Sequence, residues 1–239
     1  MSALIWEKRR QTAWVTMNNG ENRHNPDFLA SFLKIFDEIE ADPQISAVVL
    51  ASGDPKFYSL GIDLEWIMSA AGDPGRHDEL RGFLFDLNAM FRRLLTFPAP
   101  VIAAMGGHAF GDGAIMACAC DFRLMRTDRG FFCFPEVDLS IPFLPGMDAI
   151  VRKAVPSTVW YDWVLHGKKV GGEEAARAGV VLRACDGAEA LEKAALELAE
   201  SFGKKRAVTA ELKKRAHAAI LRVLEEDDPP HIRRLQLVV

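Results

Sequence analysis

Glu136 lies in the most apolar loop of the chain, a stretch rich in Phe, Pro, Ile and Leu that runs from Gly130 to Gly146. An ionised carboxyl group placed against such neighbours loses solvation, and a shift of its pKa toward neutrality limits that loss. A carboxyl group tuned in this way is suited to general acid–base catalysis. The alternative for Glu136 is structural, with the side chain extending to water or capping a turn, as charged side chains usually do.

Two glycine-containing loops each follow a predicted buried strand and lead into a predicted helix. The first is residues 56–64, Lys-Phe-Tyr-Ser-Leu-Gly-Ile-Asp-Leu, and the second is residues 106–116, Gly-Gly-His-Ala-Phe-Gly-Asp-Gly-Ala-Ile-Met. Backbone N–H groups at helix N-termini are unsatisfied donors, and Gly lets a ligand approach them closely. Two such loops facing one another would bind an oxyanion.

Neither loop carries a phosphate-binding or nucleophile motif. Gly111-Asp-Gly113 lacks the third glycine of G-x-G-x-x-G, and no P-loop sequence occurs. Ser59 is disfavoured as a nucleophile because Phe57 stands where the G-x-S-x-G elbow needs Gly, and the alternative is a local hydrogen bond. His108 could approach a ligand, although a turn histidine bonded to backbone is the commoner outcome. Asp63 is expected to cap the helix that follows it.

The composition is that of an ordinary soluble globular protein. The 239 residues are 49% hydrophobic and 26% charged, with a formal net charge of −4, and no basic stripe suits nucleic acid. No apolar run is as long as a membrane-spanning helix, and the first ten residues are unlike a secretory signal, so we expect no membrane partner and a cytoplasmic location. The four cysteines have no zinc-site spacing, and we expect buried, reduced thiols and no metal site.

Apolar strands alternate with helical segments over the first three quarters of the chain, which indicates an α/β fold with crossover connections. The predicted strands are residues 12–17, 46–51, 101–105 and 121–125. The predicted helices of this part are a segment capped by Asp27 that ends before Pro43, then residues 64–68, 79–96 and 114–120. Helices dominate afterwards, over residues 157–166, 172–178, 188–202 and 208–224. We therefore expect an α/β core over residues 1–190 and a helical region over residues 191–239. The charge run at residues 225–228 is expected to be a solvated helix end.

Three motifs together resemble the crotonase, or enoyl-CoA hydratase/isomerase, superfamily. They are the Lys-Phe-x-Ser-x-Gly-x-Asp-Leu loop, the sequence Gly-His-Ala-Phe-Gly-x-Gly with a Cys-Asp-Phe-Arg strand, and the sequence Phe-Pro-Glu-Val-x-Leu. The likeness continues through the helical tail and covers most of the chain. It implies a spiral of ββα turns with a helical C-terminal region that forms trimers or hexamers, and a coenzyme A thioester as substrate with no further cofactor.

The resemblance also assigns roles to residues in the three motifs. The two N–H groups of the family's oxyanion hole map onto Ile62, after Gly61, and Asp112, after Gly111. Glu136 matches the catalytic acid of the third motif. Lys56 resembles a position near the coenzyme A phosphates or adenine, with a solvated surface lysine as the alternative. The remaining expected substrate contacts are Gly61, Gly111, Ser59 and Phe134.

The catalytic carboxylates distinguish the reactions within the family. Hydratases resemble one another in having two glutamates, and the loop position of the second is here Ile115, which cannot exchange a proton. The pattern of a lone glutamate with an aliphatic residue at the loop position is similar to that of Δ3,Δ2-enoyl-CoA isomerases. Glu136 is therefore expected to shuttle a proton from C2 to C4 of a 3-enoyl thioester. Asp112 would repel an enolate unless its side chain turned away, or it would serve as a second acid in hydration or another thioester reaction. A paralogue that binds acyl-CoA without catalysis is the further alternative.

Overall fold

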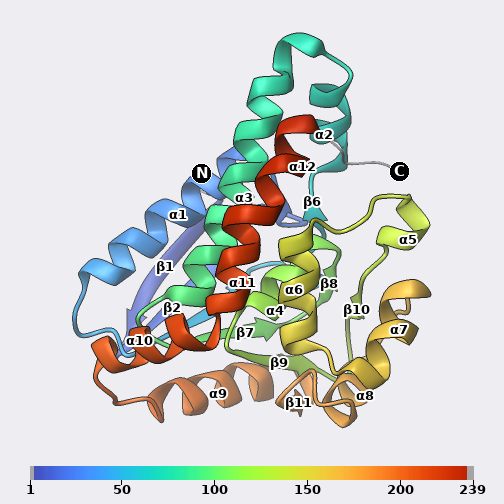
Figure 1. Ribbon diagram of the computed structural model, residues 1–239. Helices are drawn as coiled ribbons and strands as arrows, with labels where there is room; N and C mark the ends of the chain where they lie inside the picture. The colour runs from blue at the N-terminus through green and yellow to red at the C-terminus, as the bar shows by residue number, and fades with distance from the viewer. Residues whose placement is uncertain (1–2, 236–239) are drawn as a thin grey trace.

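The computed structural model describes residues 3–235, and their centre is a six-stranded sheet with the order β1-β2-β4-β7-β9-β11 (Figure 1). β1 and β2 pair antiparallel, and every other neighbouring pair in this sheet is parallel. The strands are β1 (Leu4–Arg9), β2 (Thr12–Met17), β4 (Ala47–Ser52), β7 (Val101–Met105), β9 (Phe122–Arg126) and β11 (Arg183–Cys185).

The central strands β4 and β7 are almost entirely apolar, as expected where both faces of the sheet are covered. In β4, Val48 and Leu50 belong to the main core, whereas the alternate residue Val49 belongs to a second cluster on the opposite face. Side chains of a strand point alternately to the two faces, so an uninterrupted apolar run supplies both clusters at once.

Two smaller sheets carry the loops predicted to hold the site. One is three-stranded and parallel, with the order β10 (Phe132–Cys133), β8 (His108–Phe110), β5 (Phe57–Ser59), and the other pairs β3 (Arg23–His24) with β6 (Gly61–Ile62). Each of β4, β7 and β9 is followed by a strand of the three-stranded sheet and then by a helix. This repetition is the predicted spiral of ββα turns, and the α/β fold class is confirmed.

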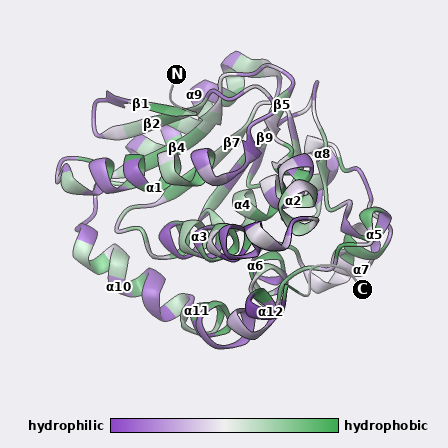
Figure 2. Ribbon diagram, turned by 90° about the horizontal axis from the view of Figure 1, so that it is seen from above, coloured by the Kyte–Doolittle hydropathy of each residue, from purple (hydrophilic) through white to green (hydrophobic). Residues whose placement is uncertain are grey.

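Helices cover both faces of the large sheet (Figure 2). α1, α3 and α4 lie over the main core, and α9 packs against β4, β7, β9 and β11 on the other face. The α-helices are α1 (Pro26–Ala41), α2 (Leu64–Ala71), α3 (His77–Thr96), α4 (Asp112–Ala119), α5 (Glu136–Leu139), α6 (Pro145–Ala154), α7 (Ser157–Leu165), α8 (Gly172–Arg177), α9 (Gly187–Glu200), α10 (Arg206–Ala216), α11 (Ala218–Arg222) and α12 (Asp228–Arg234). A 3₁₀ turn (Pro74–Arg76) precedes α3, and a π-helical turn (Val223–Asp227) precedes α12.

The helical C-terminal region folds back on the rest of the chain. In Figure 1 its last helices, in red, run alongside α3 and α6. The predicted boundary at residue 190 falls inside α9, which is itself a layer of the α/β core. The single helix predicted over residues 208–224 is wrong, because the chain leaves helical geometry at His217, whose Nδ1 lies 2.8 Å from the carbonyl oxygen of Leu95.

Asp228 corrects the expectation of a solvated helix end at residues 225–228. Its side chain is fully buried, and its carboxylate accepts hydrogen bonds from the backbone N–H of Gly146 at 2.8 Å and from Asn88 Nδ2 at 2.9 Å. Burial raises the pKa of this carboxyl group, while the two hydrogen bonds act in the opposite direction. The buried carboxylate thus ties the start of α12 to α3 and α6, whereas Glu225 and Glu226 are exposed as expected.

Short polar side chains cap the N-termini of α1 and α2. Asp63 Oδ1 accepts a hydrogen bond from the N–H of Trp66 at 3.1 Å, so the predicted cap of α2 is confirmed. The predicted cap of α1 by Asp27 is wrong, because Asn25 accepts from the N–H of Phe28 instead. Pro26 then occupies the first helical position, which needs no N–H donor and suits the fixed φ of proline.

All four cysteines are buried and free, as predicted. Burial raises the pKa of the Cys118 thiol to about 11 and that of Cys120 to about 12, so both stay protonated near neutrality. Within residues 3–235, no cluster of three or more His, Cys, Asp or Glu side chains is arranged to hold a metal ion. None of the helices in the same range is long and apolar enough to cross a membrane.

Candidate active site

A cavity of about 320 Å³ lies where β6, α2, α4, α5 and α6 meet. Among the described residues that line it, only Asp112 and Glu136 carry polar side chains. The other lining side chains are aliphatic or aromatic, and include Ile62 of β6, Ile67 and Met68 of α2, Ile115 of α4 and Phe143 before α6. An apolar cavity with a few converging polar groups is the usual form of a small-molecule site.

Glu136 is the first residue of α5 and follows Pro135 directly. Its Oε2 atom is buried and has no hydrogen-bond partner within the part of the chain that the structure describes. Its other carboxyl oxygen, Oε1, lies close to Gly111, since a Cβ atom added there would be 3.4 Å from it. The third motif therefore places Glu136 in the cavity wall, with Oε1 beside the second glycine loop and Oε2 buried without a partner.

The surroundings of Glu136 raise its pKa from 4.5 to about 8. Burial of the carboxyl group is the largest cause, a hydrogen bond from its own backbone N–H acts against it, and the neighbouring charge of Asp112 raises the pKa further. Loss of solvation and a like charge both disfavour the ionised form. The expectation from the apolar sequence around Glu136, a pKa moved toward neutrality, agrees with this direction.

The two glycine loops touch at Gly61 and Asp112. A Cβ atom added at Gly61 would lie 2.6 Å from the backbone nitrogen of Asp112 and 2.8 Å from the carbonyl oxygen of Phe110. Gly61 also has a φ of +75° and Gly111 a φ of +54°, values that favour glycine. Glycine is thus required at residue 61 for two reasons, and its absent side chain lets Ile62 and Asp112 line the same cavity.

Asp112 begins α4, and its carboxylate turns toward a buried histidine. Asp112 Oδ2 lies 2.5 Å from His24 Nδ1, and both side chains are almost completely buried. The other ring nitrogen, His24 Nε2, lies 3.1 Å from Ser59 Oγ. Ser59 Oγ also accepts a hydrogen bond from the N–H of Gly61 at 3.0 Å and lies 2.7 Å from the carbonyl oxygen of Asn22. We call Asp112, His24 and Ser59 the buried chain.

The buried chain has the residue types of a catalytic triad but not its accessibility. Ser59 is completely buried, and the cavity is lined by Leu60 and Ile62 rather than by Ser59. Its hydroxyl supports the loop that contains Gly61, which agrees with the local hydrogen bond considered in the sequence. The predicted contact of Ser59 with substrate stays a prediction, and the position behind the cavity wall indicates an indirect role.

The remaining predicted site residues lie around this centre. Phe134 is buried and packs edge-on against Phe143, which lines the cavity. Lys56 is exposed, with Nζ 4.9 Å from the centre of the Phe57 ring. His108 Nδ1 accepts a hydrogen bond from the N–H of Phe131 at 3.2 Å, as considered for a turn histidine. Lys56 and His108 are not among the residues that line the cavity.

Ile115 lines the cavity with an aliphatic side chain that is almost fully buried. It stands where the resemblance places the second glutamate of hydratases. The sequence did not reveal His24 as part of the site, since a lone histidine in a polar turn carries no periodic or motif signal. Six of the residues from Leu139 to Met147 line one side of the cavity.

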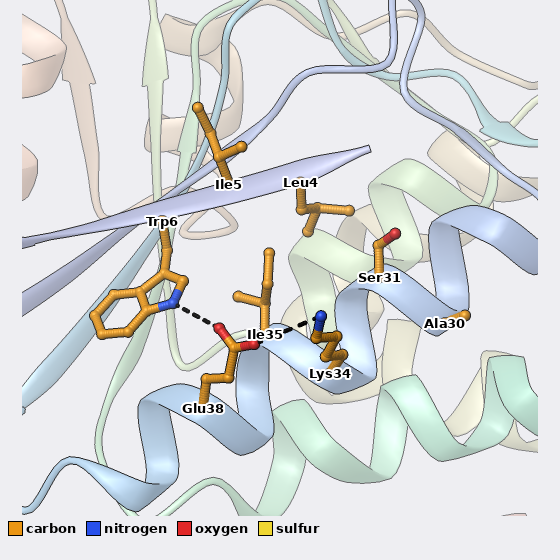
Figure 3. Close-up of a pocket in the computed structure, with 8 residues that line it drawn as sticks. All are labelled: Leu4, Ile5, Trp6, Ala30, Ser31, Lys34, Ile35 and Glu38. Carbon is orange, nitrogen blue, oxygen red and sulfur yellow. Dashed lines mark hydrogen bonds and ion pairs between the residues drawn. The ribbon is translucent and has the colours of Figure 1, made fainter. Parts of the chain in front are cut away.

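A separate open groove of about 520 Å³ lies between β1 and α1 (Figure 3). Three of its polar side chains already bind one another, because Glu38 accepts a hydrogen bond from Trp6 Nε1 at 3.1 Å and pairs with Lys34 at 3.9 Å. The carboxylate of Glu38 therefore has partners in the groove, unlike the buried Oε2 atom of Glu136. We therefore assign the chemistry to the cavity around Glu136.

The pKa of Glu136 makes a prediction about stability. With a pKa of about 8 in the folded protein and 4.5 as the ordinary value, the native state binds more protons than the unfolded state between these limits. The stability contributed by this group is therefore fully present below pH 4.5 and is lost as pH rises through 8. We expect Glu136→Gln to unfold at a higher temperature than the wild type at pH 9 but not at pH 4.5. The difference in the free energy of unfolding is up to about 1.4 kcal/mol for each pH unit between the two pKa values. Equal melting temperatures at pH 9 would contradict the raised pKa.

Comparison with known proteins bears on the family and on the fold. Residues 7–229 match the sequence profile of the enoyl-CoA hydratase/isomerase family. The chain is 32% identical to the peroxisomal enoyl-CoA delta isomerase 2 of Arabidopsis thaliana, over 84% of this chain and 85% of that one. It is 31% identical to a putative enoyl-CoA hydratase of Thermus thermophilus, over 84% of this chain and 78% of that one.

Solved structures repeat the architecture. The crystal structure of an enoyl-CoA hydratase/isomerase family protein from Pseudomonas syringae superposes with a TM-score of 0.87, at 21% identity and over 97% of both chains. At this identity the likeness concerns the fold. The three motifs, the ββα spiral and the sequence match agree, and the chain belongs to the enoyl-CoA hydratase/isomerase family.

Proposed function

We propose that this protein is an enoyl-CoA isomerase that moves the double bond of a 3-enoyl-CoA thioester to the 2-position. One observation carries the proposal: Glu136, which has a buried carboxyl oxygen without a partner, lines a cavity in which the hydratase position is filled by Ile115. A single carboxylate is sufficient to move one proton between two carbons. Activating a water molecule in the manner of the family's hydratases uses two glutamates.

The reaction begins at the thioester carbonyl. Its oxygen accepts hydrogen bonds from the backbone N–H groups of Ile62 and Asp112, whose residues line the cavity together. The ionised carboxylate of Glu136 then removes a proton from C2, and the electron pair of the broken C–H bond passes into the dienolate. Donors fixed in advance at the developing oxyanion each contribute about 3 kcal/mol to such a step.

The second half of the reaction returns the proton. Glu136, now protonated, donates to C4, the electrons of the dienolate re-form the carbonyl and leave the double bond between C2 and C3. The apolar walls contributed by Ile67, Ile115 and Phe143 exclude water from the dienolate, which favours isomerisation over hydration. Phe134 supports Phe143 in the wall of the cavity, and Lys56 is proposed to meet the coenzyme A moiety at the surface.

The rate should depend on pH through Glu136. Because the base must be ionised and its pKa in the free protein is about 8, kcat/KM for 3-enoyl-CoA is expected to rise about tenfold per pH unit below 8 and to level off above it. The measurement is a set of initial rates between pH 6 and 9. A profile that is flat across this range would contradict a buried carboxylate base.

The experiment that tests the function directly is conversion of purified cis-3-enoyl-CoA to 2-enoyl-CoA, with Glu136→Gln as the inactive control. Hydration of 2-enoyl-CoA is the second candidate function, favoured by Asp112, a second acidic residue that lines the cavity. A protein that binds coenzyme A esters without converting either substrate would be a binding paralogue. The proposal includes a homotrimer or hexamer, a cytoplasmic location and no added cofactor.

A further inference from the structure

Asp112 presents an electrostatic problem for the proposed reaction. Its backbone N–H is to stabilise a developing negative charge, yet the same residue, which lines the cavity, carries a carboxylate. An uncompensated carboxylate beside an enolate would destabilise the transition state. The buried chain of Asp112, His24 and Ser59 offers a solution that depends on where its hydrogens lie.

The hydrogens follow from the contacts of Ser59. Its hydroxyl has one hydrogen to donate and two lone pairs. The carbonyl oxygen of Asn22, at 2.7 Å, can only accept, so it takes the hydroxyl hydrogen. The N–H of Gly61 donates to one lone pair of Ser59 Oγ, and His24 Nε2 faces the same oxygen at 3.1 Å. The contact with His24 is therefore a hydrogen bond only if Nε2 carries a hydrogen.

The other ring nitrogen faces an acceptor as well. His24 Nδ1 lies against Asp112 Oδ2, which has no hydrogen to donate when the carboxyl group is ionised. Hydrogens on both ring nitrogens satisfy every one of these contacts and make the ring an imidazolium cation. The ring also stacks on Phe28 with a centroid distance of 4.5 Å, an arrangement that favours a positive charge over an aromatic face.

We propose that His24 is a positioning residue that holds Asp112 as a neutral imidazolium–carboxylate pair behind the oxyanion hole. The pair turns one carboxylate oxygen away from the thioester and cancels its charge, so that the N–H of Asp112 can meet the enolate. Ser59 completes the arrangement, because its Oγ contacts the other ring nitrogen, His24 Nε2, and accepts a hydrogen bond from the N–H of Gly61. The proposal deepens the proposed function and rests on it for its catalytic part.

The groups around His24 define what the substitutions should change. Asp112 of α4 is the titratable group that faces the ring; Ser59 of β5 and Phe28 of α1 contact its other sides. Glu136 of α5 is coupled to the pair because the charge of Asp112 raises its pKa. Removing the cation is therefore expected to leave Asp112 uncompensated and to move the rising limb of the pH–rate profile to higher pH.

The first test is made on the wild-type protein without substrate. Nitrogen-15 NMR of the histidine side chains, with the His24 signals assigned by their absence from His24→Gln, should show hydrogen on both ring nitrogens at pH 7.5. A neutral ring with one unprotonated nitrogen would overturn the proposal. This measurement judges the ion pair whether or not the protein isomerises 3-enoyl-CoA, so failure of the proposed function is distinguishable from failure of the inference.

The second test uses a double-variant cycle on isomerase activity. His24→Gln is expected to lower kcat roughly tenfold to a hundredfold with a smaller effect on KM, because an uncompensated carboxylate opposes the enolate. Adding Asp112→Asn to His24→Gln should restore at least part of this loss, a rescue that a merely structural role of His24 would not produce. His166→Gln is the matched control, since His166 pairs with Asp162 at 3.1 Å on the exposed surface. A double variant slower than His24→Gln would contradict the proposal.

Discussion

Glu136→Gln is expected to lower the rate of 3-enoyl-CoA isomerisation by about 10³- to 10⁴-fold while leaving thioester affinity nearly unchanged. The amide has almost the shape of the carboxyl group but cannot accept the C2 proton. The backbone donors at Ile62 and Asp112 do not depend on this side chain, so binding should survive. The measurements are kcat from the absorbance of the conjugated product and Kd for a coenzyme A ester by calorimetry.

Asp138→Asn is the matched control for this variant. It removes one carboxylate from the same short helix, two residues further along, and Asp138 is not among the residues that line the cavity. We expect it to change the rate less than twofold. If Glu136→Gln kept a tenth of the wild-type rate, Glu136 would not be the proton shuttle. A large loss of affinity would instead show that the carboxyl group binds substrate.

Gly61→Ala is the second variant with a large expected effect, a loss of about 10²- to 10³-fold in kcat/KM. The added methyl group would lie 2.6 Å from the backbone nitrogen of Asp112, and Gly61 holds a φ of +75°. The two loops would have to separate, which removes the geometry in which two N–H groups meet one oxygen. The measurement is kcat/KM together with far-ultraviolet circular dichroism to establish folding.

Gly20→Ala separates backbone strain from the contact. Gly20 has a φ of +58° but a Cβ atom there would meet nothing within 4 Å. This variant should show a modest loss of stability, about 1 kcal/mol, and unchanged kinetics. Equal kinetic losses in Gly20→Ala and Gly61→Ala would show that strain alone, and not the approach of the two loops, explains the result.

The sequence was most informative where chemistry and local structure coincide. The continuous apolar run of β4 predicted a buried strand, and the apolar surroundings of Glu136 predicted the direction of its pKa shift. Asp63 was recognised as a cap because the cap and its helix are adjacent in sequence. In each case the deciding neighbours lie within a few residues.

Long-range polar contacts were missed for the opposite reason. His24 and Asp112 are 88 residues apart, and only the approach of β3 to α4 brings the imidazole and the carboxylate together. Asp228 looked like part of a solvated charge run, yet it reaches Gly146, 82 residues away, in the interior. A buried polar pair leaves no periodic pattern in either partner, so its members resemble surface residues until the fold is known.

The central claim is that one carboxylate, Glu136, moves a proton within the substrate without adding water. The most direct measurement incubates the purified protein with cis-3-enoyl-CoA and, separately, with trans-2-enoyl-CoA, and identifies the products by mass spectrometry and absorbance. We predict 2-enoyl-CoA of unchanged mass from the first substrate, little hydrated product from the second, and loss of the first reaction in Glu136→Gln. Efficient addition of one water to the second substrate, lost in Asp112→Asn, would contradict the account and make Asp112 a second catalytic acid.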